Sequence, residues 1–136
     1  MLLVSSAVGY SFVPHGNVPV GCSFSSGQMT YVRMIMIEAG TVAGDGFVAA
    51  LSYPGLETCA DTVPTKKFLS NDGWHITAHE AAFIAARLRR AVELNVIAEL
   101  LVFLDDRPDA VEVRDCVEEF AAFNERAAEQ GGYYVR

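Results

Sequence analysis

The chain has 136 residues, of which 51% are hydrophobic and 20% charged, and its formal net charge at pH 7 is −7. This length and composition predict a single domain over residues 1–136 with a buried core, and they exclude a disordered chain. The acidic balance argues against nucleic acid and anionic membranes as partners, because phosphate surfaces require a positive field. It is compatible with a protein partner that has a basic surface.

The cysteines and the N-terminus bear on the cellular compartment. Cys22, Cys59 and Cys116 are odd in number and widely spaced, and no CxxC motif occurs. They predict a reducing compartment rather than a disulfide framework, so we expect a cytoplasmic protein. Residues 1–8 lack the basic start of a signal peptide and are interpreted as a mobile N-terminal extension. No stretch approaches the ~20 apolar residues that cross a bilayer.

The first predicted elements are a short strand and a helix. Tyr10–Val13 alternates as a strand does and stops at Pro14. A helix is predicted over residues 26–39, because apolar residues recur there every three or four positions and Gly40 follows as a helix-ending glycine. A strand is the alternative, since residues 31–37 are rich in β-branched side chains.

A second strand is predicted at residues 47–53, which have the length and the flanking turn residues of a strand. The alanines in this segment suit a helix equally well. Leu56–Ser70 contains a proline and is interpreted as an irregular, mobile connection.

The clearest local signal is the start of the second helix. Asn71–Gly73 predicts a turn. Thr77 and Glu80, three residues apart, then form a capping box, in which each side chain accepts a hydrogen bond from the other residue's backbone N–H. The helix is predicted to run over residues 77–94 and to break at Asn95.

Two more helices complete the pattern. Val96–Leu104 is strongly apolar with helical spacing and is interpreted as a short packed helix, a buried strand being the alternative. Asp105–Pro108 is a break, and Asp109 caps a helix over residues 110–130. Tyr133–Val135 then forms a final strand. The predicted fold class is α+β, with three or four helices packed on a small, mainly antiparallel sheet.

The histidines raise the question of a metal site. His75 and His79 are four residues apart, as in helical zinc pairs, but the cap at Thr77 lies between them, so they do not share a helical face. A metal site built on His75 and His79 would need a third ligand from elsewhere, such as His15, Cys59 or Asp72. We interpret the histidines as surface or capping residues and predict no metal and no cofactor.

A cysteine nucleophile is the other chemistry considered. Cys22 lies in a glycine-rich segment, where a thiolate paired with His15 or His75 would be exposed, but no flanking motif supports this pairing. Cys116 falls on the apolar side of its helix and is predicted to be core. Cys59 has no activating neighbour in the sequence.

Acidic side chains on the last helix favour a binding role. The residues selected for a binding surface are Glu112, Glu118, Glu119 and Trp74. The carboxylates would steer a basic partner, so the sequence predicts a non-enzymatic protein-binding module. Two alternatives stay open. One is a small enzyme or metal-binding domain that uses His75 and His79 with a cysteine or an acid. The other is a structural homo-oligomer, suggested by the high apolar content.

Two stretches carry a resemblance. Asp72-Gly73-Trp74-His75-Ile76-Thr77 precedes an alanine-rich helix, and Phe120-Ala121-Ala122-Phe123-Asn124 leads through Ala127-Ala128-Glu129-Gln130-Gly131-Gly132-Tyr133. Over residues 71–136 the chain resembles a group of short uncharacterised bacterial proteins. The resemblance implies a small bacterial domain, and it implies no activity and no functional residues.

Overall fold

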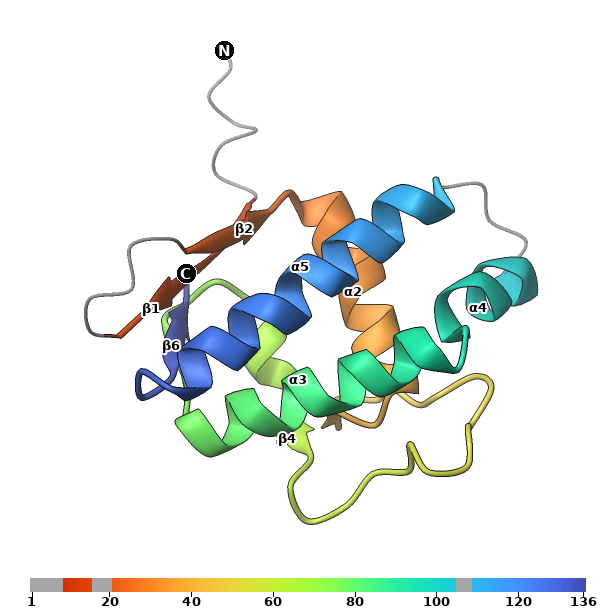
Figure 1. The fold of residues 1–136 in the computed structure, drawn as a ribbon, viewed down its shortest axis with the longest axis horizontal. Coiled ribbons are helices and arrows are strands. Elements are labelled where there is room, and N and C mark those ends of the chain that lie inside the picture. Colours follow the sequence, from red (N-terminus) through yellow and green to blue (C-terminus); the bar gives the residue numbers. More distant parts are fainter. Residues whose placement is uncertain (1–8, 16–20, 105–108) are drawn as a thin grey trace.

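The computed structural model describes residues 9–15, 21–104 and 109–136. The predicted N-terminal extension at residues 1–8 and the predicted break at residues 105–108 lie outside these ranges. Within the described ranges the chain forms an α+β fold, as the sequence predicts (Figure 1).

Four short strands build the main sheet. In chain order they are β1 (Tyr10–Pro14), β2 (Cys22–Phe24), β5 (Trp74–Ile76) and β6 (Tyr133–Val135). The spatial order is β2-β1-β6-β5, and every neighbouring pair is antiparallel. The C-terminal strand therefore lies inside the sheet and joins β1 to β5, which confirms the predicted strand at Tyr133–Val135.

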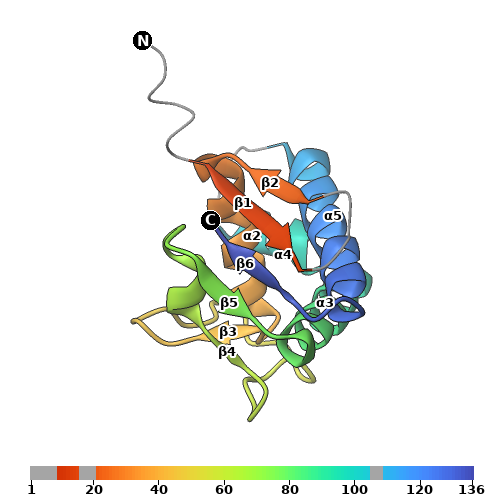
Figure 2. The same cartoon turned by 90° about the vertical axis from the view of Figure 1, so that its left-hand side faces the viewer.

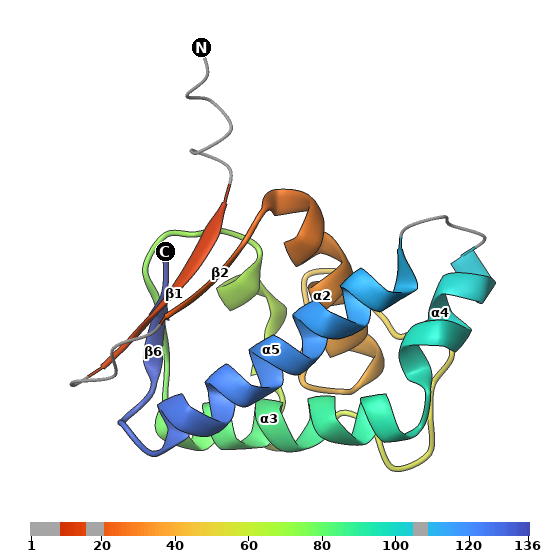
Figure 3. The same ribbon diagram turned by 45° about the horizontal axis from the view of Figure 1, so that its top comes forward.

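Four helices lie on one side of this sheet. They are α2 (Ser26–Glu38), α3 (Ala78–Glu93), α4 (Val96–Leu104) and α5 (Ala110–Ala128). Figure 2 shows the helices behind the sheet, and Figures 1 and 3 show α3 and α5 side by side. The predicted helices are confirmed, and the strand alternatives for the first and third of them are wrong.

Each long helix starts at a residue that satisfies its free backbone N–H groups. Thr77 and Glu80 form the predicted capping box of α3, and Asp109 accepts from two N–H groups at the start of α5. Ser25 makes an equivalent capping box with Gln28 at the start of α2. These contacts fix where the helices begin and hence which of their faces meet the sheet.

The core is an aromatic cluster between the sheet and the helices. Phe12 of β1 lies at its centre, with its ring centroid 4.7 Å from that of Phe120 in α5 and 5.9 Å from that of Tyr133 in β6. All three side chains are fully buried. The other members of the cluster are Phe24, Phe68 and Phe123. Buried aromatic contacts of this kind connect elements from both ends of the chain.

The predicted strand at residues 47–53 is wrong. Apart from a single bridge at Phe47, this segment is irregular. The buried carboxylate of Glu38 accepts hydrogen bonds from the backbone N–H groups of Ala50 and Leu51. A helix-terminal side chain thus satisfies the backbone groups that a neighbouring strand would otherwise have satisfied.

Five other short elements were not predicted as such. The region 56–70, expected to be irregular, contains β4 (Val63–Pro64), which pairs in parallel with β3 (Val42–Ala43), and a short 3₁₀ helix, η1 (Thr65–Phe68). Strands β2 and β5 have three residues each, and the glycine, proline and asparagine residues before them predict loop and turn instead.

Candidate functional site

The outer side of α5 carries the acidic residues that the sequence analysis selected. This helix buries Val113, Val117 and Phe120 against the rest of the domain, so its other side faces solvent. Five carboxylates and two guanidiniums lie between Ala110 and Ala128, which gives α5 a net charge of −3 out of −7 for the whole chain. α5 is therefore the most acidic of the four described helices.

The three selected glutamates point to different neighbours around α5. Glu112 accepts from Gln28 Nε2 at 3.3 Å, on the side facing α2. Glu119 lies on the same side and accepts from the Cys22 thiol at 3.5 Å. Glu118 accepts from Arg114 Nε at 3.2 Å, within α5 itself.

Two further carboxylates of α5 complete this surface. Glu125 accepts two hydrogen bonds from Arg89 of α3, at 3.1 and 3.0 Å, and these bonds hold the pKa of Glu125 below its usual value. Asp115 is exposed and has no hydrogen-bond or ion-pair partner among the described residues. Its charge is thus fully available to an approaching cation.

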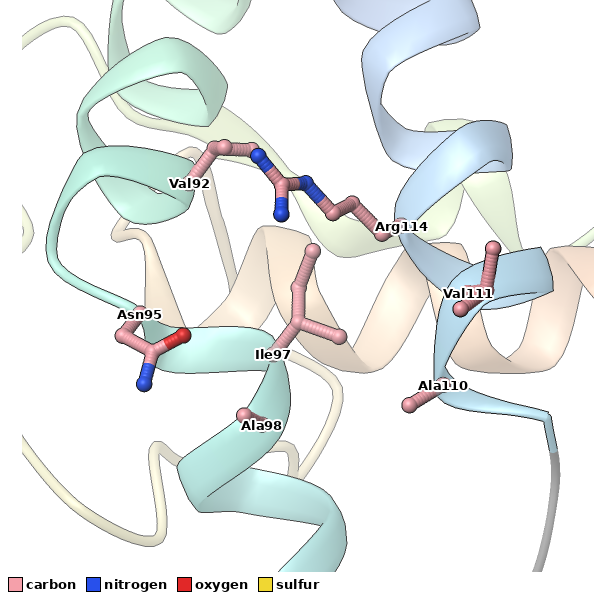
Figure 4. Close-up of a pocket in the computed structure, with 7 residues that line it drawn as sticks. All are labelled: Val92, Asn95, Ile97, Ala98, Ala110, Val111 and Arg114. Carbon is pink, nitrogen blue, oxygen red and sulfur yellow. The ribbon is translucent and has the colours of Figure 1, made fainter.

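A small apolar groove opens at the N-terminal end of α5 (Figure 4). It has a volume of about 160 Å³ and lies where α3 turns into α4 and both face α5. The turn is sharp because Asn95 adopts a left-handed conformation, with φ of 63°. The lining residues are Val92, Asn95, Ile97, Ala98, Ala110, Val111 and Arg114.

The groove and the acidic side chains are continuous. Val111 lines the groove and is 67% exposed. Asp115 and Glu118 follow it at i+4 and i+7, so the three side chains form one stripe along α5. On α4, Ala98 lines the groove and Val102, which is 80% exposed, follows it at i+4. We call this surface, formed by the groove and by Val102, Val111, Asp115 and Glu118, the α5 surface.

Trp74 lies away from the α5 surface. It belongs to β5, at the edge of the sheet opposite β2, whereas α5 packs beside β2 (Figure 2). Its ring is half-buried, its Nε1 donates to Ser70 Oγ at 3.1 Å, and Lys66 Nζ lies 5.5 Å from its centroid. The tryptophan therefore does not form one surface with the acidic residues.

His75 and His79 diverge. His79 is in the first turn of α3, where its Nε2 lies 2.9 Å from Asp61 Oδ1, and this hydrogen bond raises the pKa of His79. His75 is exposed on β5 and its ring contacts those of His15 and Tyr134. The structure therefore brings His15 and His75 together and separates both from His79.

No described side chains complete a metal cluster of three or more ligands. Across residues 9–15, 21–104 and 109–136, no group of at least three His, Cys, Asp and Glu side chains is arranged to hold a metal ion. Cys59, the remaining candidate ligand, is exposed and lies beside Arg87, with 3.8 Å between Sγ and Nη2.

The suggestion that Cys22 is an exposed nucleophile is wrong. Its thiol is buried, and burial together with the neighbouring Glu119 carboxylate raises the pKa of Cys22 to about 12. Cys116 is buried as predicted, and burial raises its pKa as well. Burial and the raised pKa values make both thiols poor nucleophiles.

The groove is the part of the site that sequence reasoning missed. Its walls come from three helices, so no local pattern predicts it. The available signal was Val111, an apolar residue on the polar side of an amphipathic helix, where it has no core to enter. Asp115 lies among the selected glutamates of α5 and was not predicted as part of the surface.

Comparison with known proteins adds no assignment: no family model matches the chain, and no curated protein and no solved structure matches it. Within the described ranges, no helix has both the length and the apolar character needed to cross a membrane. The geometry of the molecule therefore carries the functional argument.

Proposed function

We propose that the protein is a non-enzymatic protein-binding module whose α5 surface holds a basic segment of a partner protein. The observation that carries this proposal is the continuity of an apolar groove with a stripe of carboxylates on one helix. The groove takes one apolar side chain, and Asp115 and Glu118 take the lysines or arginines that flank it in the partner.

The dimensions and the chemistry of the surface support this division of roles. A volume of about 160 Å³ is close to that of the engineered cavity of about 150 Å³ that holds a benzene molecule, so one leucine or phenylalanine side chain is of suitable size. A buried apolar anchor commonly dominates the affinity of an interface. Charges at the rim mainly accelerate encounter and exclude wrong partners.

The charge also favours a different protein over a second copy of this chain. Each copy carries −7, and α5 alone carries −3. Two copies that met through the α5 surface would bring like charges together, which costs binding free energy. For a partner with a basic surface, the same charges make the binding free energy more favourable.

A peptide-display selection tests the proposal. A random peptide library is selected against the immobilised protein and then counter-selected against Asp115→Asn/Glu118→Gln. We expect enriched peptides that are net positive and contain an aliphatic or aromatic residue. Their affinity should fall about tenfold in the double variant, because two attractive charges are lost, and it should weaken as salt rises.

The control variant is Asp45→Asn/Asp72→Asn, which removes the same charge from exposed residues outside α5. It should bind the enriched peptides with unchanged affinity. Enrichment of neutral or acidic peptides, or equal loss of affinity in the two double variants, would contradict the proposal.

A further inference from the structure

The face of the sheet away from the helices carries a cluster of imidazole and aromatic side chains. Tyr134 of β6 pairs with Val13 on one side and with His75 on the other. His15 follows β1 directly and stays attached to the sheet through its N–H, which donates to Gly132 O at 3.1 Å. Figure 2 shows this face toward the viewer, with the helices behind it.

The two histidine rings lie against each other and against Tyr134. The centroids of His15 and His75 are 5.0 Å apart, with an interplanar angle of 64°. Both rings contact Tyr134, at centroid distances of 4.5 Å for His15 and 5.3 Å for His75. The pairing of β1, β6 and β5 thus sets the distance between the two imidazole rings.

The ring nitrogens of this pair make no hydrogen bond within the described part of the chain. His15 Nε2 is buried and has no hydrogen-bond partner in the described part of the chain. For His75 the backbone oxygen accepts from Lys67, and no described residue hydrogen-bonds to the ring. A buried nitrogen without a hydrogen-bond partner destabilises the fold, so a ligand that satisfies it is favoured.

We propose that His15 and His75 together bind one divalent transition-metal ion of the nickel, copper and zinc class. Two imidazoles that share an ion at metal–nitrogen distances near 2.1 Å have ring centroids about 4.5–5.5 Å apart, for angles at the metal between 90° and 109°. The observed 5.0 Å lies within this range. Neutral imidazole is a good ligand for these ions.

This site differs in kind from a closed structural metal site. The described residues supply two ligands, so water completes the coordination and the ion exchanges readily. The Arg136 guanidinium, 5.1 Å from the Tyr134 centroid, is a nearby positive charge that weakens cation binding. The site is on a different face of the domain from the α5 surface and does not depend on the proposed function.

Isothermal titration of nickel chloride into the full-length protein, prepared without an affinity tag, tests the proposal. All variants carry Cys59→Ser, which removes the exposed thiol as a competing ligand. We expect one equivalent of Ni²⁺ to bind. His75→Phe, which keeps a ring on Tyr134 but removes both nitrogens, should weaken binding at least about tenfold, as loss of one of two ligands requires. His15→Phe should do the same.

The matched control is His79→Phe, because the chain has three histidines and His79 is the one outside the cluster. It should bind Ni²⁺ with unchanged affinity. The electron paramagnetic resonance spectrum of the copper-loaded protein gives a second readout and should show coupling to two nitrogens. No saturable binding, equal affinity in His75→Phe, or loss of binding in His79→Phe would overturn the proposal.

Discussion

Tyr133 and Tyr134 are neighbours with opposite roles. Tyr133 is fully buried and its hydroxyl donates to Asn124 Oδ1 at 2.8 Å, while Asn124 Nδ2 donates to the Phe120 carbonyl at 2.8 Å. Tyr134 is half-buried on the other face of the sheet. The strand alternation therefore separates a structural tyrosine from one that contacts the histidine pair.

The Tyr133 hydroxyl is expected to matter for stability. Tyr133→Phe leaves the buried Asn124 oxygen without its donor, so the free energy of unfolding should fall by about 1–3 kcal/mol. Tyr134→Phe is the matched control and should change it by less than about 0.5 kcal/mol. Chemical denaturation of both variants measures the difference. Equal effects would show that the buried hydrogen bond adds nothing beyond burial of the ring.

The three thiols should differ in reactivity. Cys59 is exposed, whereas Cys22 and Cys116 are buried with raised pKa values. Ellman's reagent should therefore react rapidly with one thiol per native chain and with three in denaturant. Cys59→Ser should abolish the rapid native reaction. Rapid reaction of a second thiol in the native protein would show that Cys22 is accessible.

At the scale of elements, the connection between α5 and β6 depends on a glycine. Gly131 and Gly132 both have positive φ, of 94° and 101°. A Cβ on Gly132 would overlap the Ile76 carbonyl oxygen of β5, whereas a Cβ on Gly131 would meet open space. The close approach at Gly132 lets the chain leave the helix directly into the middle of the sheet.

Alanine substitutions at these two glycines should have unequal effects. Gly131→Ala forces a residue with a side chain into a backbone conformation of positive φ but creates no clash. It should lower the free energy of unfolding by about 1–2 kcal/mol. Gly132→Ala adds a clash with backbone and should cost about 3 kcal/mol or more. Thermal melts of the two variants compare the costs. If Gly132→Ala fails to fold while Gly131→Ala folds, the same ranking is supported; similar melting temperatures would refute it.

The helices were predictable because their signals are local. Caps at Thr77 and Asp109 and apolar spacings of three and four fix both where helices begin and which side they bury. The strand predicted at residues 47–53 failed because Glu38, distant in sequence, binds that backbone instead. Strands β2 and β5 were not predicted, because glycine and other turn residues precede each of them in the sequence; they form by pairing with β1 and β6, respectively.

The candidate surfaces were predictable to different degrees. Helical periodicity places Glu112, Glu118 and Glu119 on the solvent side of α5, as the structure has them. The groove was not predictable, because α3, α4 and α5 each supply part of its wall. The contact between His15 and His75 depends on the register of β1, β6 and β5, which sequence spacing does not encode.

At the scale of the whole molecule, the helical layer and the sheet present two distinct surfaces. The helical side carries the acidic stripe and the apolar groove of the α5 surface. The open face of the sheet carries two imidazoles, a phenol and a guanidinium, from His15, His75, Tyr134 and Arg136. The charge of −7 is thus distributed unevenly, and cationic partners should be directed to one side.

Amide chemical-shift mapping tests whether the α5 surface binds a basic segment. Isotope-labelled protein is titrated with a synthetic peptide that has a central leucine flanked on both sides by arginines. We expect saturable shifts at Ala98, Val111, Asp115 and Glu118, which weaken as salt rises. Shifts confined to the sheet face around His75 and Tyr134, or no shifts at low salt, would contradict this expectation.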